Sequence, residues 1–192
     1  MNIVLYGEEK LLLVQRLEDL KKKYQCTSDD MNYMVYHAGE TPMKEIIEDA
    51  LTQPFLTEYK MVVLKNPIFL TKEKPKKKLV TDEDIKLFLD YIEHDNPTTI
   101  FVIYQDQRNF DERKKVVKSL RKHAKWYEME KLTFDQLYKA TREAIIHRNA
   151  SIEDDALTLL LDRCGNDLLT ISNQVEKLCL YTHNIKLSLI HI

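Results

Sequence analysis

Short runs of apolar residues alternate along the first two thirds of the chain with segments in which apolar residues recur every three or four positions. The runs predict β-strands and the periodic segments predict helices. The strongest run is Thr98 to Tyr104, which contains four consecutive large apolar residues. A strand without polar alternation is covered on both faces, as in a parallel sheet flanked by helices. The predicted strands are 3–6, 31–37, 61–64, 98–104 and 125–129.

Four amphipathic helices are predicted between these strands. Glu8 and Glu9 suit the first turn of the first helix, because a helix N-terminus favours negative charge, and Pro42 suits the first position of the second. Thr81 and Asp84 have the spacing of a capping box at the start of the third helix. The side chains predicted to face the core are Leu11, Leu12, Val14, Leu17, Leu20, Ile46, Ile47, Ala50, Leu51, Ile85, Phe88, Leu89, Ile92, Val116, Val117 and Leu120.

The pattern changes after Lys131, where strand-like runs stop and helical periodicity continues. We therefore predict an α/β domain over residues 1–131, with a parallel sheet flanked by helices, and a small three-helix domain over 132–192. The predicted start and stop signals of the three helices are Thr133 with Gln136, Ser151 with Asp154, Gly165 in the left-handed conformation, and Asp167.

The connector between the second helix and the third strand is unusual. Pro54 cannot continue a helix, because it lacks an N–H and its ring clashes with the preceding turn, so the helix is expected to end near Leu51 or Thr52. Phe55 and Leu56 then lie side by side in the connector. Two such side chains either fold back into the core or await a partner. The residues alone favour the core, because isolated apolar residues near a surface are common.

Composition excludes several classes of protein. The 192 residues carry a net charge of −2, so no global field draws the chain to nucleic acid or to an anionic membrane. Cys26, Cys164 and Cys179 share no paired spacing, which indicates free thiols in a reducing compartment. We find neither a signal peptide nor an apolar run of membrane length. The protein is therefore expected to be soluble and cytoplasmic, without contact with a membrane.

The turn after the first predicted strand lies where a nucleotide-binding domain carries its phosphate loop. That loop requires glycines, a lysine and a hydroxyl in a fixed spacing. Here the turn is Gly7-Glu8-Glu9-Lys10-Leu11, with one glycine, no hydroxyl and two carboxylates that would repel phosphate. The six histidines show no metal-ligand spacing, and no catalytic triad can be argued. The chain is therefore expected to have no cofactor, no metal and no catalytic site.

Two basic segments are candidates for contact with DNA or with a neighbouring subunit. The loop 72–78 contains Lys76, Lys77 and Lys78, which could contact DNA phosphates. The predicted basic helix 111–122 contains Arg113 and Lys114. For both segments a solvated surface is the more common outcome.

Seven segments together, in the right order and over nearly the whole chain, resemble the delta subunit of the bacterial DNA polymerase III clamp loader. Each motif alone has little specificity, but the set is fairly specific. The segments are Leu5 to Glu9, Gln53 to Leu56, Lys60 to Asn66, Asn96 to Ile103, Asp111 to Lys115, Cys164 to Leu168 and Asn173 to Leu178.

The resemblance implies an AAA+-like α/β domain without a working ATP site, followed by a helical lid domain. It also implies a third, helical collar domain that assembles the subunit into a five-membered ring. The chain stops at Ile192, where the family would continue, and residues 188–192 do not match that continuation. We therefore expect either a truncated chain or a shift of the reading frame. The family belongs to the DNA polymerase III holoenzyme, a nucleotidyltransferase, although no polymerase active site is expected in this chain.

In the family, a hydrophobic pair just before the third strand inserts into a pocket on the beta sliding clamp. That pair corresponds to Phe55 and Leu56, next to Pro54, and Gln53 and Thr57 would lie at the rim of the contact. The implied partners are the clamp, the other clamp-loader subunits (delta-prime and tau/gamma), and primer-template DNA through the assembled complex.

Three functions are therefore weighed, in order of preference. The first is a non-catalytic clamp-loader arm that binds and opens the sliding clamp during DNA replication. The second is a divergent P-loop-type NTPase, against which the missing phosphate-loop residues count. The third is a DNA-binding adaptor that acts through the lysine-rich segments.

Overall fold

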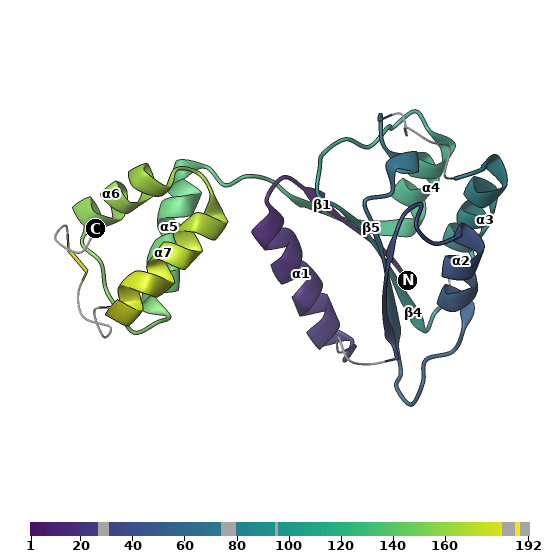
Figure 1. The fold of residues 1–192 in the computed structure, drawn as a ribbon, viewed down its shortest axis with the longest axis horizontal. Helices are drawn as coiled ribbons and strands as arrows, with labels where there is room; N and C mark the ends of the chain where they lie inside the picture. Colours follow the sequence, from purple (N-terminus) through teal and green to yellow (C-terminus); the bar gives the residue numbers. More distant parts are fainter. Residues whose placement is uncertain (27–30, 74–79, 95, 182–186, 189–192) are drawn as a thin grey trace. The chain divides into compact units, whose positions relative to one another are not determined.

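A five-stranded, entirely parallel sheet forms the centre of the first of two structural units (Figure 1). The computed structural model describes residues 1–26, 31–73, 80–94, 96–181 and 187–188. The sheet order is β2-β3-β4-β1-β5. The strands are β1 (Asn2–Gly7), β2 (Tyr33–His37), β3 (Lys60–Lys65), β4 (Thr99–Gln105) and β5 (Ala124–Met129). The predicted α/β class with a parallel sheet is thus confirmed.

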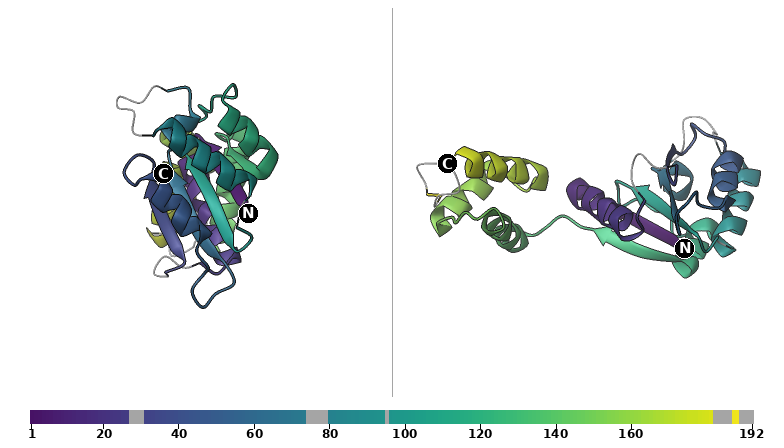
Figure 2. Two further views of the ribbon diagram at one scale, coloured as in Figure 1. Left: turned by 90° about the vertical axis from the view of Figure 1, so that its right-hand side faces the viewer. Right: turned by 90° about the horizontal axis from the view of Figure 1, so that it is seen from below.

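Helices cover both faces of this sheet, and alternate residues of each strand pack against opposite layers. Figures 1 and 2 show α1 (Lys10–Lys23) on one side of the sheet, and α2 (Met43–Leu51), α3 (Asp82–Glu93) and α4 (Lys115–His123) on the other. The neighbours Ile3, Val102 and Val63 pack in the α1 layer. The next residues in register, Val4, Ile103 and Leu64, pack in the opposite layer. This two-sided burial is the reason that the three central strands, β3, β4 and β1, lack polar alternation.

The second unit is a bundle of three helices, which Figure 2 shows packed on one another. They are α5 (Phe134–Ile146), α6 (Asp154–Cys164) and α7 (Leu168–Tyr181). Leu137, Leu160 and Val175, one from each helix, are buried in its core. The division between the units falls between Met129 and Glu130, whereas the sequence prediction placed it after Lys131.

The predicted buried faces of two helices each contain one error. Val14 and Leu51 were predicted to be buried but are 50% and 53% exposed. Each side chain lies roughly 90° around the helix from the centre of the buried face, given about 100° per residue. In α1 the buried position belongs instead to Leu13, which has no exposed surface. Both errors come from including a residue at the margin of a narrow apolar stripe.

Several predicted helix boundaries are also wrong. Glu9 occupies the N-cap of α1 and Glu8 precedes it, so neither lies in the first turn. Pro42 is likewise the N-cap of α2, one position earlier than predicted. The helix predicted over 111–122 begins only at Lys115, because the preceding residues form a separate turn.

In the second unit, two predicted helix signals need correction. The N-cap of α6 is Glu153, so the predicted capping box of Ser151 with Asp154 does not form. Asp154 instead pairs with Arg142 of α5. Gly165 ends α6 with a positive φ of 65°, but its ψ of −155° lies in a region that is essentially restricted to glycine and is not left-handed helical. The capping boxes at Thr81 and Thr133 are confirmed.

Gly7, the last residue of β1, has no side chain and therefore allows the backbone there to lie very close to the end of β5. Its φ is +146°, and a Cβ added to it would lie 2.1 Å from the carbonyl oxygen of Met129. That oxygen accepts hydrogen bonds from the backbone N–H groups of Glu8 (3.1 Å) and Glu9 (3.2 Å). A side chain at position 7 would therefore displace the end of β5.

We predict that Gly7→Ala lowers the free energy of unfolding of the first unit by at least about 2 kcal/mol, through backbone strain and the clash with Met129. Trp126, the single tryptophan, lies in β5, so its fluorescence in a urea titration measures this transition. Gly165→Ala is the control for substitution of a positive-φ glycine, because it introduces backbone strain without a clash and lies in the second unit, away from Trp126. The control should leave the Trp126 transition unchanged; an equally stable Gly7→Ala variant would contradict the prediction.

Candidate docking site

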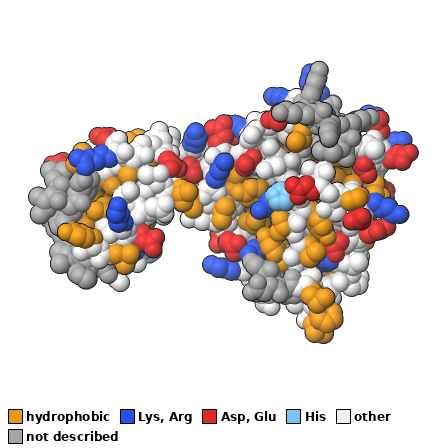
Figure 3. All heavy atoms as spheres, viewed as in Figure 1, with side chains coloured by type: hydrophobic (Ala, Val, Ile, Leu, Met, Phe, Trp, Pro, Cys, Tyr) orange, Lys and Arg blue, Asp and Glu red, His pale blue; other side chains and the backbone are white. Residues whose placement is uncertain are grey.

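The loop over residues 52–59, between α2 and β3, carries two large apolar side chains outward from the first unit. Phe55 is 58% exposed and Leu56 is 89% exposed. Figure 3 shows hydrophobic side chains protruding from the lower edge of the first unit, where Figure 1 places this loop. We call residues 52–59 the tip loop, and Phe55 with Leu56 the tip. Of the two outcomes considered from sequence, the side chains do not fold back into the core.

A buried lysine fixes the start of β3 to the end of α2. Lys60 is 3% exposed, and its Nζ donates to Asp49 Oδ1 (2.7 Å), to the Asp49 carbonyl oxygen (2.9 Å) and to Thr52 Oγ1 (2.8 Å). The last carbonyl groups of a helix have no partner within the helix and carry partial negative charge. An ammonium group at this position satisfies one of them and neutralises Asp49. The two ends of the tip loop are thereby joined.

The next two carbonyl oxygens of α2 accept hydrogen bonds from the segment around the start of β4. Thr99 Oγ1 donates to the Ala50 oxygen (2.8 Å), and Asn96 Nδ2 donates to the Leu51 oxygen (3.2 Å). Three successive carbonyl oxygens at the end of α2 therefore have side-chain donors from other elements. These contacts make the base of the tip loop part of the core structure.

Tyr36 of β2 completes the surroundings of the Asp49 carboxylate. Its hydroxyl donates to Asp49 Oδ2 at 3.2 Å. Burial and the negative charge of Asp49 raise the pKa of Tyr36 to about 12. The phenol therefore stays protonated and remains a hydrogen-bond donor at any physiological pH.

The backbone of the tip is fixed by a side chain from a different part of the chain. Asn32 is 1% exposed, and its Nδ2 donates to the Phe55 carbonyl oxygen (2.8 Å) while its Oδ1 accepts the Phe55 N–H (2.6 Å). Thr57 Oγ1 donates to the Tyr59 oxygen at 2.9 Å on the return of the loop. Gln53 is exposed, whereas Pro54 and Thr57 are partly buried. The predicted tip and rim residues thus lie together in one loop.

A hollow of about 390 Å³ borders the tip on the side of α1. Leu56, Thr57 and Tyr59 of the loop form one wall, and Tyr24 and Gln25 at the end of α1 form the other. The rings of Tyr24 and Tyr59 meet edge to face at 5.4 Å. The outward tip and this hollow give the surface both a projection and a recess.

Sequence reasoning missed the residues that support the tip. It named Lys60 and Asn96 only as the first residues of two segments that resemble the family, and it gave Asn32 no role. The one available signal was a lysine directly before a fully apolar run, since a charge at the edge of a buried strand requires a partner. The identity of that partner could not be read from spacing.

The predicted basic residues that the structure describes are engaged within the first unit. Arg113 makes a bidentate pair with Asp111, with Nε to Oδ1 at 2.9 Å and a second N–H to Oδ2 at 3.0 Å. The Arg113 guanidinium lowers the pKa of Asp111 to about 2. Lys114 Nζ donates to the carbonyl oxygens of Phe69 (2.9 Å) and Thr71 (2.7 Å). Lys76, Lys77 and Lys78 lie outside the described residues.

The turn where a nucleotide-binding domain would hold phosphate is closed by the chain itself. It lies at the carboxyl end of β1, next to β4, which is the usual ligand position in open parallel sheets. Its N–H groups at Glu8 and Glu9 both point to the Met129 carbonyl oxygen, so they are not available to an anion.

Within the described part of the chain, no three His, Cys, Asp or Glu side chains gather as a metal site requires. Among the described helices, none has the length and apolar character needed to span a bilayer.

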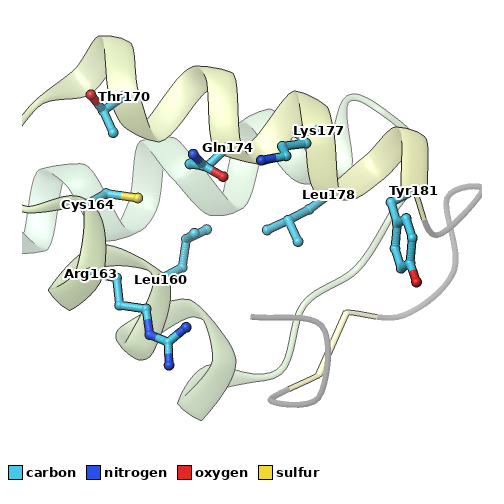
Figure 4. Close-up of a pocket in the computed structure, with 8 residues that line it drawn as sticks. All are labelled: Leu160, Arg163, Cys164, Thr170, Gln174, Lys177, Leu178 and Tyr181. Carbon is cyan, nitrogen blue, oxygen red and sulfur yellow. The ribbon is translucent and has the colours of Figure 1, made fainter.

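A second hollow, of about 460 Å³, lies between α6 and α7 in the second unit (Figure 4). Leu160 and Leu178 face each other across it, and Lys177, Tyr181 and Cys164 lie around its edge. Burial raises the pKa of the Cys164 thiol, which disfavours the reactive thiolate.

Comparisons with known proteins agree on one family. The family model for the DNA polymerase III delta subunit matches residues 4–130. DNA polymerase III subunit delta of Bacillus subtilis (strain 168) is 32% identical over 178 residues, which cover 92% of this chain and 51% of that protein. The solved Bacillus subtilis DNA clamp loader delta protein superposes with a TM-score of 0.75 at 30% identity, covering 99% of this chain and 56% of that one. The chain spans about half the length of these relatives.

More distant structures show the fold alone. The RuvB Holliday junction branch migration motor of Thermotoga maritima superposes with a TM-score of 0.58 at 12% identity, covering all of this chain and 59% of that chain. Together with the solved delta protein, this likeness confirms the predicted AAA+-like fold.

We predict that Lys60→Met lowers the free energy of unfolding of the first unit by about 2–3 kcal/mol, because it leaves Asp49 and the end of α2 without their donor. The loss should be smaller than for a fully buried pair, since Asp49 keeps 24% of its side chain exposed. Trp126 fluorescence in a denaturant titration measures the change.

Lys44→Met is the matched control for this substitution, because Lys44 lies on α2, the helix that contains Asp49, and pairs with Glu48 at 3.7 Å with both side chains exposed. The control should cost less than about 0.5 kcal/mol. Equal effects of the two substitutions would show that the Lys60 contacts do not stabilise the fold.

Proposed function

The chain belongs to the DNA polymerase III delta subunit family, and from that premise we propose that it is the clamp-binding arm of a bacterial clamp loader. In this function the tip, Phe55 and Leu56, inserts into an apolar pocket on the beta sliding clamp. Gln53, Pro54 and Thr57 border the contact.

The observation that carries the proposal is a pair of exposed apolar side chains on a loop with a fixed base. Phe55 and Leu56 project into solvent while Lys60 and Asn32 fix the loop around them. Exposed apolar surface is unfavourable in water, and its burial in a partner supplies free energy. Large apolar anchors that fill a pocket are typical centres of binding energy in protein interfaces. The hollow beside Leu56 gives the clamp a recess for a side chain of its own.

Clamp opening follows if the tip binds the opened clamp more tightly than the closed one. A partner shifts a conformational equilibrium only by its difference in affinity for the two states. This mechanism needs no nucleotide in the chain itself, in keeping with the closed turn at Gly7. In the proposed assembly this chain works together with the other subunits, delta-prime and tau/gamma, and primer-template DNA binds to the complex.

The second unit, beginning near residue 130, serves in this proposal as the lid domain that links the α/β domain to the rest of the assembly. The site of action is the cytoplasm, where the replication machinery of a bacterium works. Arg113 and Lys114, both engaged within the first unit, are proposed to shape the surface next to η1 (Ile68–Leu70) and not to bind DNA directly.

We predict that Phe55→Ala and Leu56→Ala each weaken clamp binding by about 2–4 kcal/mol, or roughly 30- to 1,000-fold, and that the double variant abolishes it. Because both side chains are exposed, the free energy of unfolding should change by less than about 0.5 kcal/mol. Titration of a fluorescently labelled beta clamp measures the affinity.

Leu180→Ala is the control for loss of an exposed leucine, since Leu180 is 71% exposed in the second unit. It should leave the affinity for the clamp unchanged. Clamp affinity that survives the double substitution would end the assignment. Micromolar binding of ATP to the chain would instead favour the NTPase hypothesis, and strongly salt-dependent binding of DNA without the clamp would favour the adaptor.

A further inference from the structure

Asn32 makes an unusual contact for a side chain, because it pairs with both backbone polar groups of one distant residue. Its amide donates to the Phe55 oxygen and accepts from the Phe55 N–H, at 2.8 and 2.6 Å. The side-chain amide of Asn32 thus makes the two hydrogen bonds that a neighbouring β-strand would otherwise make with the backbone of Phe55. Since Asn32 is 1% exposed, its amide is shielded from water, whereas Phe55 is 58% exposed.

The backbone of Asn32 is itself fixed by the sheet. Its carbonyl oxygen accepts the Met61 N–H at 2.7 Å, at the point where the β2–β3 pairing begins. The orientation of the Asn32 amide is therefore set by the core of the first unit. Through this amide, the position of Phe55 is set by the sheet as well.

Leu56 has a backbone conformation that needs such support. Its φ of +57° lies in the left-handed region, which is unfavourable for a side chain with a Cβ. Such conformations persist where the surrounding contacts determine them. The flanking contacts here are Asn32 with Phe55 on one side and Thr57 with Tyr59 on the other. The turn at Leu56 leaves its side chain 89% exposed.

We propose that Asn32 is a positioning residue for the tip, which holds Phe55 and Leu56 in the clamp-binding conformation without contacting the clamp. This inference rests on the proposed function. A tip that is already ordered loses less conformational entropy on binding, so its affinity is higher than that of the same residues on a mobile loop. The ordering of the tip is completed when the chain folds, through the amide of Asn32.

The first test is Asn32→Ala, with the tip residues unchanged. We expect clamp affinity to fall by about 10- to 100-fold, and exchange of the Phe55 amide hydrogen with solvent, followed by NMR, to accelerate in the free protein. Asn66→Ala is the matched control. Asn66 accepts the Asp106 N–H at 3.2 Å, at the opposite end of β3, so its loss should change stability but not clamp affinity.

Asn32→Asp separates positioning from general stability. An ionised carboxylate can accept the Phe55 N–H but repels the Phe55 oxygen, whereas a protonated carboxyl can donate to that oxygen and restore both hydrogen bonds. The affinity of Asn32→Asp relative to the unchanged chain should therefore increase as the pH falls from 8 to 5. A ratio that does not vary with pH would overturn the positioning role.

The outcomes distinguish this inference from the function on which it rests. Loss of binding on Phe55→Ala and Leu56→Ala, together with normal binding of a folded Asn32→Ala variant, would overturn the role of Asn32 alone. Normal binding after substitution of the tip itself would overturn the proposed function. Should Asn32→Ala fail to fold, the pH response of Asn32→Asp decides the question.

Discussion

The contact of Lys60 with the end of α2 is the interaction on which the tip loop depends. A lysine buried in a sheet is costly unless its charge is paired and its N–H groups are satisfied. Here all three bonds of the ammonium group go to the last turn of α2 and to Thr52. The same contact closes the tip loop at its base. The charge thus fixes where a helix ends and where the next strand begins.

This arrangement places a rigid base beneath an exposed apolar tip. Apolar side chains at a loop tip usually collapse onto the nearest surface, since burial is favourable. Phe55 is prevented from doing so because its backbone N–H and oxygen are bound to Asn32, and Leu56 continues outward from there. The free protein keeps unfavourable surface that a partner can bury. The polar contacts at the base of the loop therefore order its backbone, while the apolar side chains at the tip stay exposed.

At the carboxyl end of β1, the turn that precedes α1 is closed by the chain itself. The topology still places a strand, a turn and a helix where related folds bind phosphate. The N–H groups of that turn, however, bind Met129, and Gly7 allows the close approach that this requires. A backbone carbonyl occupies the position of an anion. The closed turn therefore lies at the carboxyl ends of the parallel strands, and the tip lies at their amino-terminal ends.

The sequence by itself determined the elements, the parallel sheet and the position of the tip. Consecutive buried residues in β3 and β4, and the break at Pro54, express local rules that act over a few residues. The exposure of Phe55 and Leu56 could not be decided in this way, and pattern alone favoured the core. It depends on Asn32, Lys60 and Thr99, which lie far from one another in the chain and become neighbours only when the strands pair. Spacing in a sequence carries no record of such contacts, because the geometry that creates them belongs to the assembled sheet.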